Sequence, residues 1–244
     1  MSKTAAAVII GDEILAGKIQ ERNLAYLAQE LFALGIALRR AVICPDEVEI
    51  IAEDVNRLRK SYDMVFTSGG VGPTHDDVTI LAVAKAFGRK VVRSPEIEDL
   101  IREYYRCRLT QAHLRMADMP EGGRLVSNPE MRLPTVAIEN VYIFPGIPEL
   151  FRMKFPVLRG MLGGDTAISS RAVYLRSEEG LIAAPLSEVV ERHPGVKIGS
   201  YPRWGETEYR VKVTFDGTDP EAIESALQAL LRRLPADEVV EVDD

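Results

Sequence analysis

The sequence predicts an α/β protein whose parallel sheet is covered by helices, followed by a smaller α+β domain. Residues 5–10 (AAAVII) form a wholly apolar run that ends at a glycine, which is typical of a strand buried on both faces. Leucines and alanines between residues 24 and 34 recur at helical spacing, and Gly35 is placed to end that helix. Residues 209–215 alternate apolar with polar side chains, as in a strand with one solvent-facing side.

Strand and helix patterns keep alternating along the first two thirds of the chain, which favours a parallel sheet. The further elements predicted there are a strand at 37–44, a helix at 47–60, a strand at 64–66, helices at 78–87 and 95–108, and short strands at 135–139 and 141–144. Residues 109–134 show no periodicity, so we interpret them as an irregular segment or a lid. Pro148 is placed to begin one more helix.

The glycine-rich stretch at residues 160–165 (GMLGGD) predicts a boundary between domains at 1–164 and 165–244. Beyond it the predicted elements are a strand at 172–175, a helix at 180–192, a pair of strands that includes 209–215, a helix at 220–233 and a last strand at 239–240. This βαββαβ order indicates a two-layer domain with helices on one sheet face. Trp204 lies at the predicted hairpin tip, where it could stack on a flat ring or pack against another surface.

Composition excludes several classes of protein. The net charge of −7 argues against a surface that collects nucleic-acid phosphates, so we expect no nucleic-acid partner. No apolar run is long enough to span a bilayer and no signal-peptide pattern precedes the first strand, so we expect a cytoplasmic protein without a membrane partner. Cys44 and Cys107 are too few for a disulfide framework or a zinc site, and both are predicted to be reduced thiols.

A glycine-rich loop, residues 68–74 (SGGVGPT), follows a predicted strand and precedes a predicted helix. Gly69, Gly70 and Gly72 lack a Cβ, so their backbone amides could approach a phosphate. The alternative is that these glycines only make a tight turn between the strand and the helix. Thr74 could cap the helix or touch the ligand.

Acidic side chains follow this loop and the two preceding strands. Asp76 and Asp77 would repel a bound phosphate unless a cation lies between, so we predict a divalent metal (Mg, Mn or Co), with or without a monovalent cation. Asp46 follows the strand at 37–44 and Glu13 follows the first strand, at the same edge of a parallel sheet as Asp77. We therefore predict Asp77, Asp46 and Glu13 as metal ligands. The alternatives are helix caps: one of the two adjacent aspartates near residue 78, and Asp46 before the helix at 47–60.

The predicted catalytic set consists of carboxylates and one lysine. Asp46, Asp77 and Asp76 would position the metal and its water, and Lys18 would offset developing negative charge. His75 lies in the same loop and could hydrogen bond there or act as a base.

These motifs resemble the N-terminal domain of the competence/damage-inducible protein A family over most of residues 1–160. The matching segments are residues 11–17 (GDEILAG), Asn23, 69–74 (GGVGPT), 76–79 (DDVT) and 145–149 (PGIPE). Residues 72–79, 144–150 and 199–202 are also similar to the molybdopterin-binding-like part of eukaryotic FAD synthases. The second domain resembles the small KH-type module of these families, but it lacks the Gly-x-x-Gly loop with which KH domains bind RNA.

The resemblance implies a three-layer α/β/α molybdopterin-binding-like domain with a second, smaller α+β (KH-like) domain. Relatives of this kind bind molybdopterin or hydrolyse the pyrophosphate of ADP-ribose or FAD with a divalent metal. It also implies that Gly11, Asn23, Pro145 and Gly146 join the ligand site, and that Asp46 and Asp77 occupy acidic positions of the active site.

Two departures from the bacterial family narrow what can be carried over. The chain lacks the Gly-Thr-Ala-Pro-Gly stretch after Asn128 and Pro129, and it has no nicotinamide-nucleotide amidase domain. We therefore predict a metal-dependent hydrolase of a nucleotide pyrophosphate, with pterin-phosphate binding or a non-catalytic nucleotide-binding module as alternatives. A homodimer or another homo-oligomer is expected from the resemblance.

Overall fold

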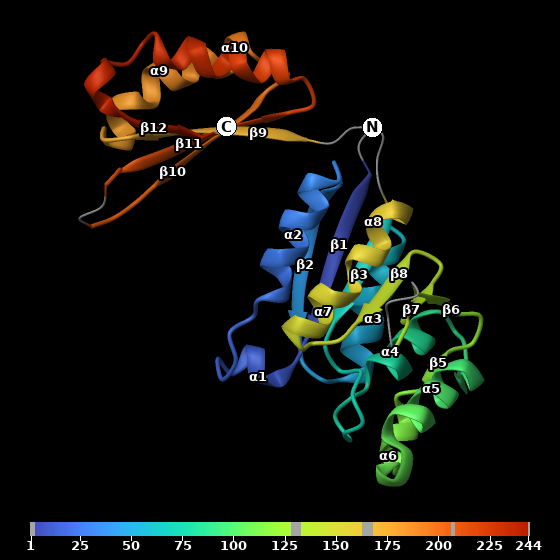
Figure 1. The fold of residues 1–244 in the computed structure, drawn as a ribbon. Helices are drawn as coiled ribbons and strands as arrows, with labels where there is room; N and C mark the ends of the chain where they lie inside the picture. Colours follow the sequence, from blue (N-terminus) through green and yellow to red (C-terminus); the bar gives the residue numbers. More distant parts are fainter. Residues whose placement is uncertain (1–2, 128–132, 163–167, 206–207, 244) are drawn as a thin grey trace. The chain divides into compact units, whose positions relative to one another are not determined.

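The computed structural model describes residues 3–127, 133–162, 168–205 and 208–243. The chain separates into two units, residues 1–165 and 166–244, and each is considered by itself (Figure 1). The boundary predicted after residue 164 lies outside the described residues.

A six-stranded sheet forms the centre of the first unit, with the strand order β2-β1-β3-β8-β7-β6. The strands are β1 (Thr4–Ile10), β2 (Ala37–Cys44), β3 (Met64–Ser68), β6 (Arg124–Val126), β7 (Thr135–Ile138) and β8 (Val141–Phe144). The four strands β2, β1, β3 and β8 are parallel, and β7 pairs antiparallel with both β8 and β6. The carboxyl ends of the four parallel strands therefore meet at one edge of the sheet.

Helices cover both faces of this sheet, which confirms the predicted α/β/α class. One layer holds α2 (Asn23–Ala33), α7 (Pro148–Lys154) and α8 (Pro156–Leu162), and the other holds α3 (Val48–Arg59), α4 (Thr79–Ala86) and α5 (Pro95–Tyr105). Side chains of β1 alternate between the layers: Ala5, Ala7 and Ile9 pack in the first core. Ala6, Val8 and Ile10 pack in the second core. The apolar run at 5–10 is thus buried on both faces, as the sequence predicts.

The segment predicted to be irregular contains short elements, so that interpretation was wrong for its described part. These are α6 (Gln111–Arg115), β6 and β5 (Asp118–Pro120), which pairs antiparallel with β4 (Val91–Arg93); a 3-10 helix η1 (Arg106–Arg108) precedes them, at the end of the helix predicted at 95–108. Each has three to five residues, too few to show a periodic pattern in the sequence. Residues 128–132 lie outside the described part of the chain.

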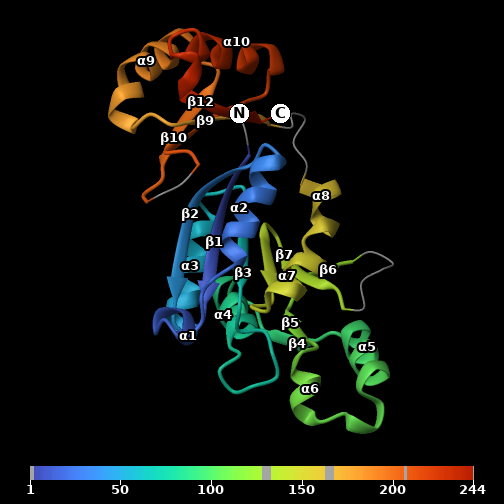
Figure 2. The ribbon, with the colours of Figure 1, turned by 60° about the vertical axis from the view of Figure 1, so that its left-hand side comes forward.

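The second unit has the predicted βαββαβ order. Its elements are β9 (Ser169–Leu175), α9 (Glu179–Arg192), β10 (Lys197–Pro202), β11 (Val211–Gly217), α10 (Pro220–Leu231), a 3-10 helix η2 (Ala236–Glu238) and β12 (Val239–Asp243). The antiparallel sheet has the order β10-β11-β9-β12, and both helices lie on one of its faces (Figure 2). Trp204 follows β10 and is fully exposed.

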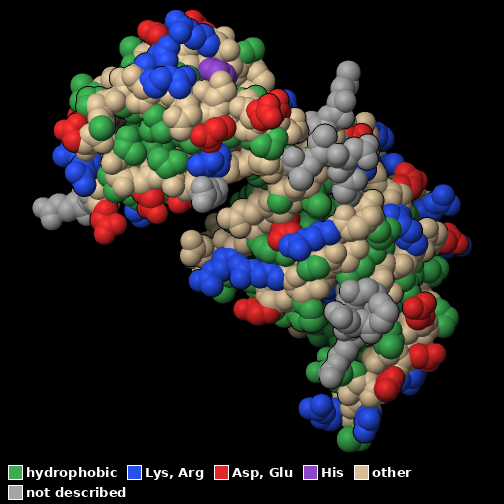
Figure 3. Space-filling view, turned by 45° about the horizontal axis from the view of Figure 1, so that its top comes forward, with side chains coloured by type: hydrophobic (Ala, Val, Ile, Leu, Met, Phe, Trp, Pro, Cys, Tyr) green, Lys and Arg blue, Asp and Glu red, His purple; other side chains and the backbone are tan. Residues whose placement is uncertain are grey.

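The surface mixes charges of both signs. The face drawn in Figure 3 shows basic and acidic side chains interspersed among apolar ones. Both cysteines are free, as predicted, and Cys44 is buried. Among the helices of the described ranges, none is long and apolar enough to cross a bilayer.

Candidate functional site

Four loops meet at the carboxyl edge of the large sheet, at the lower end of that unit in Figure 1 near the short helix α1 (Asp12–Leu15). They are residues 11–18, 45–47, 69–78 and 145–147. We call this edge the acidic rim and define it by Asp12, Glu13, Asp46, Asp76 and Asp77. Backbone hydrogen bonds tie the loops together: the Gly11 amide donates to the Cys44 carbonyl at 3.2 Å, and the Gly69 amide donates to the Phe144 carbonyl at 3.1 Å.

The glycine loop requires glycine at two positions for steric reasons. Gly69 and Gly70 have φ values of 111° and 62°, in the region that side chains disfavour. A Cβ on Gly69 would overlap the carbonyl oxygen of Ile10, and one on Gly70 would overlap the Thr79 hydroxyl. Gly146 is also close, because a Cβ there would lie 3.3 Å from the Gly69 Cα. The loop is therefore a tight turn, and this turn sets which amides face outward.

Two of the three glycine amides expected to hold phosphate, those of Gly69 and Gly72, donate hydrogen bonds within the protein, which corrects the sequence-based expectation. The Gly69 amide continues the pairing with β8, and the Gly72 amide donates to Asp77 Oδ1 at 2.6 Å. Among the described residues, the Gly70 and Val71 amides have no hydrogen-bond acceptor. These two donors are the ones left for an anion.

Asp77 holds the loop in shape. Its carboxylate accepts hydrogen bonds from the Gly72 amide, from the Thr74 amide at 2.7 Å and from the Thr74 hydroxyl. Helix α4 begins at Thr79 without a side-chain cap, so the alternative that Asp76 or Asp77 caps this helix is wrong. The same contacts show that the Thr74 hydroxyl does not cap α4 either. The backbone turns back on itself here, which brings the amides of residues 72 and 74 to Asp77 before the helix starts.

Asp46 joins the loop after β2 to the loop after β1. Its Oδ2 accepts a hydrogen bond from the Asp12 amide at 2.9 Å, and α3 has no side-chain cap, so the capping alternative for Asp46 is also wrong. A Cβ on Gly70 would lie 3.5 Å from Asp46 Oδ1, which places this carboxylate against the glycine loop. Burial raises the pKa of Asp46, and the charges of Glu13, Asp12 and Asp76 raise it further, against the lowering effect of the Asp12 amide.

The predicted metal ligands Asp77, Asp46 and Glu13 do not form a ready-made cluster, and the metal stays a prediction. In the described part of the chain, no three His, Cys, Asp or Glu side chains come together as a metal site. Asp77 is satisfied by loop donors, and the charges that act on Asp46 are those of Glu13, Asp12 and Asp76. The donor chemistry still fits Mg²⁺, because this ion often takes one or two carboxylates together with substrate phosphates and water.

Lys18 and Asn23 differ from their expected places. Lys18 is exposed, and it forms no ion pair with any described carboxylate, so its ammonium is not placed at the acids. Asn23 is buried beneath the rim, where its Nδ2 donates to Ser68 Oγ and to the Gly146 carbonyl, both at 2.8 Å. Asn23 therefore braces two loops, and the Ser68 hydroxyl adds a 3.4 Å contact to the Pro145 carbonyl.

Sequence reasoning missed the role of Thr79. This residue is fully buried, its hydroxyl donates to the Gly69 carbonyl at 2.8 Å, and its amide donates to the Gly70 carbonyl at 2.9 Å. Both carbonyls are thereby turned toward the helix, so the amides that follow them, those of Gly70 and Val71, point away from it. A hydroxyl residue at the start of a helix whose residues 80–84 are all apolar was the available signal.

Two family models match the chain. Residues 6–160 match the family model described as a probable molybdopterin binding domain, and residues 167–243 match the FAD synthase middle domain. The first match covers well over half of the chain. The chain therefore belongs to the molybdopterin-binding domain family, and its second unit is similar to the FAD synthase middle domain.

Individual relatives refine that placement and confirm the resemblance found in the sequence. A protein of Archaeoglobus fulgidus is 35% identical, over 91% of this chain and 93% of its own length. A probable FAD synthase of Caenorhabditis briggsae is 30% identical over 99% of this chain, which spans only 51% of the worm protein. The crystal structure of the protein CinA of Thermoplasma acidophilum, described as of unknown function, superimposes with a TM-score of 0.61. That match has 28% identity and covers 66% of this chain and 98% of that one.

Proposed function

We propose that the first unit binds a nucleotide pyrophosphate of the FAD or ADP-ribose type at the acidic rim and hydrolyses it with a divalent metal. The observation that carries this proposal is the pair of unoccupied amides, Gly70 and Val71, beside the Asp46 carboxylate. The worm relative, named a probable FAD synthase, supports a dinucleotide with a flavin as one candidate substrate.

Each part of the rim has a distinct role in the proposed reaction. The Gly70 and Val71 amides donate to a phosphate oxygen, and Asp77 keeps them in place before the substrate arrives. A water oxygen attacks one phosphorus atom, the bridging P–O bond breaks, and two phosphate monoesters leave. Asp46 accepts a proton of the water, a role that its raised pKa favours.

The predicted metal belongs beside Asp46 in this scheme. Glu13 and Asp76 are exposed and act on Asp46 through their charges, so they would hold the ion together with phosphate oxygens. A bound divalent metal supplies positive charge that offsets the negative charge of the phosphates.

The test is incubation of the purified protein with FAD, ADP-ribose and related dinucleotides, each with Mg²⁺, Mn²⁺ or Co²⁺. FAD would yield FMN and AMP, and ADP-ribose would yield ribose 5-phosphate and AMP, both measurable by chromatography. If no combination of dinucleotide and metal gave cleavage, the proposed hydrolase activity would be refuted.

A second candidate function is the binding of a pterin phosphate, and the description of the matching family model favours it. The same amides and acids would hold the ligand's phosphate. Fluorescence of a pterin that copurifies with the protein would support this candidate. Tight nucleotide binding without turnover would instead support a non-catalytic binding module.

A further inference from the structure

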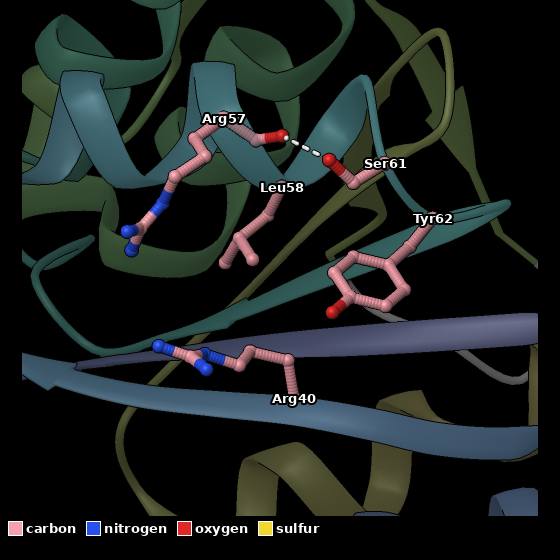
Figure 4. A pocket seen from close by; sticks show the side chains of 5 residues that line it. All are labelled: Arg40, Arg57, Leu58, Ser61 and Tyr62. Carbon is pink, nitrogen blue, oxygen red and sulfur yellow. Dashed lines mark hydrogen bonds between the residues drawn. The ribbon is translucent and has the colours of Figure 1, made fainter.

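A second polar pocket lies in the same unit, toward the amino ends of the strands and away from the acidic rim. It has a volume of about 240 Å³ and is lined by Arg40 of β2, Arg57 and Leu58 of α3, and Ser61 and Tyr62 of the turn before β3. In Figure 4 the guanidinium groups of Arg40 and Arg57 and the Tyr62 hydroxyl all face this space, and Leu58 lies between Arg57 and Tyr62.

Positive charge exceeds negative charge in this pocket. Arg57 pairs with Asp54, whereas Arg40 forms no ion pair with any described carboxylate. Of the two guanidinium groups, only that of Arg57 has a carboxylate partner among the described residues, on a protein whose net charge is −7. Arg40 projects from a strand, and its backbone is held by pairing with Ala6 of β1.

The carboxyl end of α3 carries partial negative charge, which would repel an anion if its carbonyls faced the pocket. Donors within the protein already bind these carbonyls. The Arg57 carbonyl accepts from the Ser61 hydroxyl at 3.1 Å, as drawn in Figure 4. The Leu58 carbonyl accepts from the Ser61 and Tyr62 amides, both at 3.0 Å. The Arg59 carbonyl accepts from Asn140 Nδ2 at 2.9 Å. The negative end of the helix is therefore covered by donors, while the guanidinium groups and the Tyr62 hydroxyl keep free N–H and O–H bonds.

We propose that this pocket binds a phosphate monoester or free phosphate. Guanidinium groups match the oxygens of a phosphate in pairs, and the Tyr62 hydroxyl adds a donor. Binding here does not depend on the reaction at the rim, although each product of the proposed hydrolysis carries the same group.

Isothermal titration of the full chain with inorganic phosphate, AMP and adenosine tests this proposal. Arg40→Gln should weaken phosphate and AMP binding about tenfold or more, and Tyr62→Phe should weaken it several-fold, because each removes one donor to the anion. The matched control is Arg39→Gln: Arg39 is the preceding residue of the same strand, is also exposed, and is not among the residues that line the pocket. The affinity of the Arg39→Gln protein for phosphate and AMP should stay within about twofold of that of the unaltered protein.

Further measurements distinguish free phosphate from a nucleotide monoester as the ligand, and the pocket from the rim as the site. Equal affinity for phosphate and AMP indicates a site for free phosphate, and tighter binding of AMP indicates a nucleotide monoester. Asp77→Ala should leave this binding unchanged, even where it abolishes cleavage at the rim. Equal weakening by Arg39→Gln and Arg40→Gln, binding of adenosine as tight as that of AMP, or no phosphate binding at about 1 mM would overturn the proposal.

Discussion

The two ends of the six-stranded sheet present opposite chemistry on the same strands. At the carboxyl ends, glycines and acids form a rim in which backbone amides are the donors and carboxylates hold the loops together. At the amino ends, arginine and tyrosine side chains surround a pocket, and the Arg57 and Leu58 carbonyls at the end of α3 already accept hydrogen bonds. Recognition at the rim therefore depends on backbone geometry, whereas recognition at the pocket depends on charge.

This difference sets how each end responds to substitution. A single methyl group added at the rim meets closely packed atoms, because a Cβ on Gly69 would overlap the Ile10 carbonyl and one on Gly70 would overlap the Thr79 hydroxyl. Removing a side chain at the pocket costs a donor and leaves the fold intact. Salt should weaken anion binding more at the pocket, where exposed guanidinium groups carry the interaction.

The largest expected effect is that of Asp77→Ala on turnover. Loss of three hydrogen bonds to the loop should misplace the Gly70 and Val71 amides and lower the rate of pyrophosphate cleavage about 100-fold. Asp77→Asn keeps one acceptor oxygen and should retain intermediate activity. Product formation from FAD or ADP-ribose measures both.

A matched control for Asp77 exists in the second unit. Asp219 also accepts from two backbone amides, those of Glu221 and Ala222, where it caps α10. Asp219→Ala should lower the free energy of unfolding by about 1 kcal/mol and leave turnover unchanged. Full turnover by Asp77→Ala would show that the loop does not need this carboxylate.

The next effect concerns stability. Gly69→Ala places a Cβ against the Ile10 carbonyl at a φ of 111°, so the free energy of unfolding should fall by at least about 2 kcal/mol. Gly160→Ala is the control, because Gly160 lies in α8 and nothing stands within 4 Å of a Cβ there. That substitution should stabilise the protein by up to about 1 kcal/mol in urea unfolding. Equal stabilities of the two variants would contradict the crowded geometry of the rim.

Patterns spanning many residues made most of the fold predictable. The apolar run at residues 5–10 predicted a strand buried on both faces, and the alternation at 209–215 predicted the one-sided sheet of the second unit. The order of strands along a parallel sheet also placed Asp46 and the glycine loop at one edge. Elements of three to five residues between 106 and 126 gave no such pattern.

Hydrogen-bond partners at the rim could not be predicted in the same way. Aspartates before a helix usually cap it, yet Asp77 and Asp46 accept amides from the glycine loop and from α1, because the loops turn back before the helices begin. Contacts with Phe144 and Thr79 decide which amides of the loop remain without an acceptor. Phe144 is distant in the sequence, and Thr79 lies in a helix, so neither contact could be predicted. The predicted homodimer and cytoplasmic location stay predictions.

The smallest effect tests the charge of the rim itself. Burial and negative neighbours raise the pKa of Asp46, so the folded state binds the proton more tightly than the unfolded state does. The resulting stabilisation is complete at pH values below the ordinary pKa of an aspartate, and it is lost as pH rises through the raised pKa of Asp46. Asp46→Asn keeps an oxygen for the Asp12 amide and removes the charge, so it should raise the unfolding temperature at about pH 7 and have less effect at about pH 4.

Asp63 provides a control of opposite sign at the other end of the sheet. The Thr4 hydroxyl and amide donate to Asp63 at 2.7 Å and lower its pKa. The charged form of Asp63 therefore stabilises the fold at pH values above the ordinary pKa of an aspartate. Asp63→Asn should therefore lower the unfolding temperature at about pH 7, and the difference should shrink as pH falls through the lowered pKa. If both variants shifted the unfolding temperature in the same direction at neutral pH, the crowding of negative charge around Asp46 would not be the cause. The rim would then lack the electrostatic strain that a bound cation is proposed to relieve.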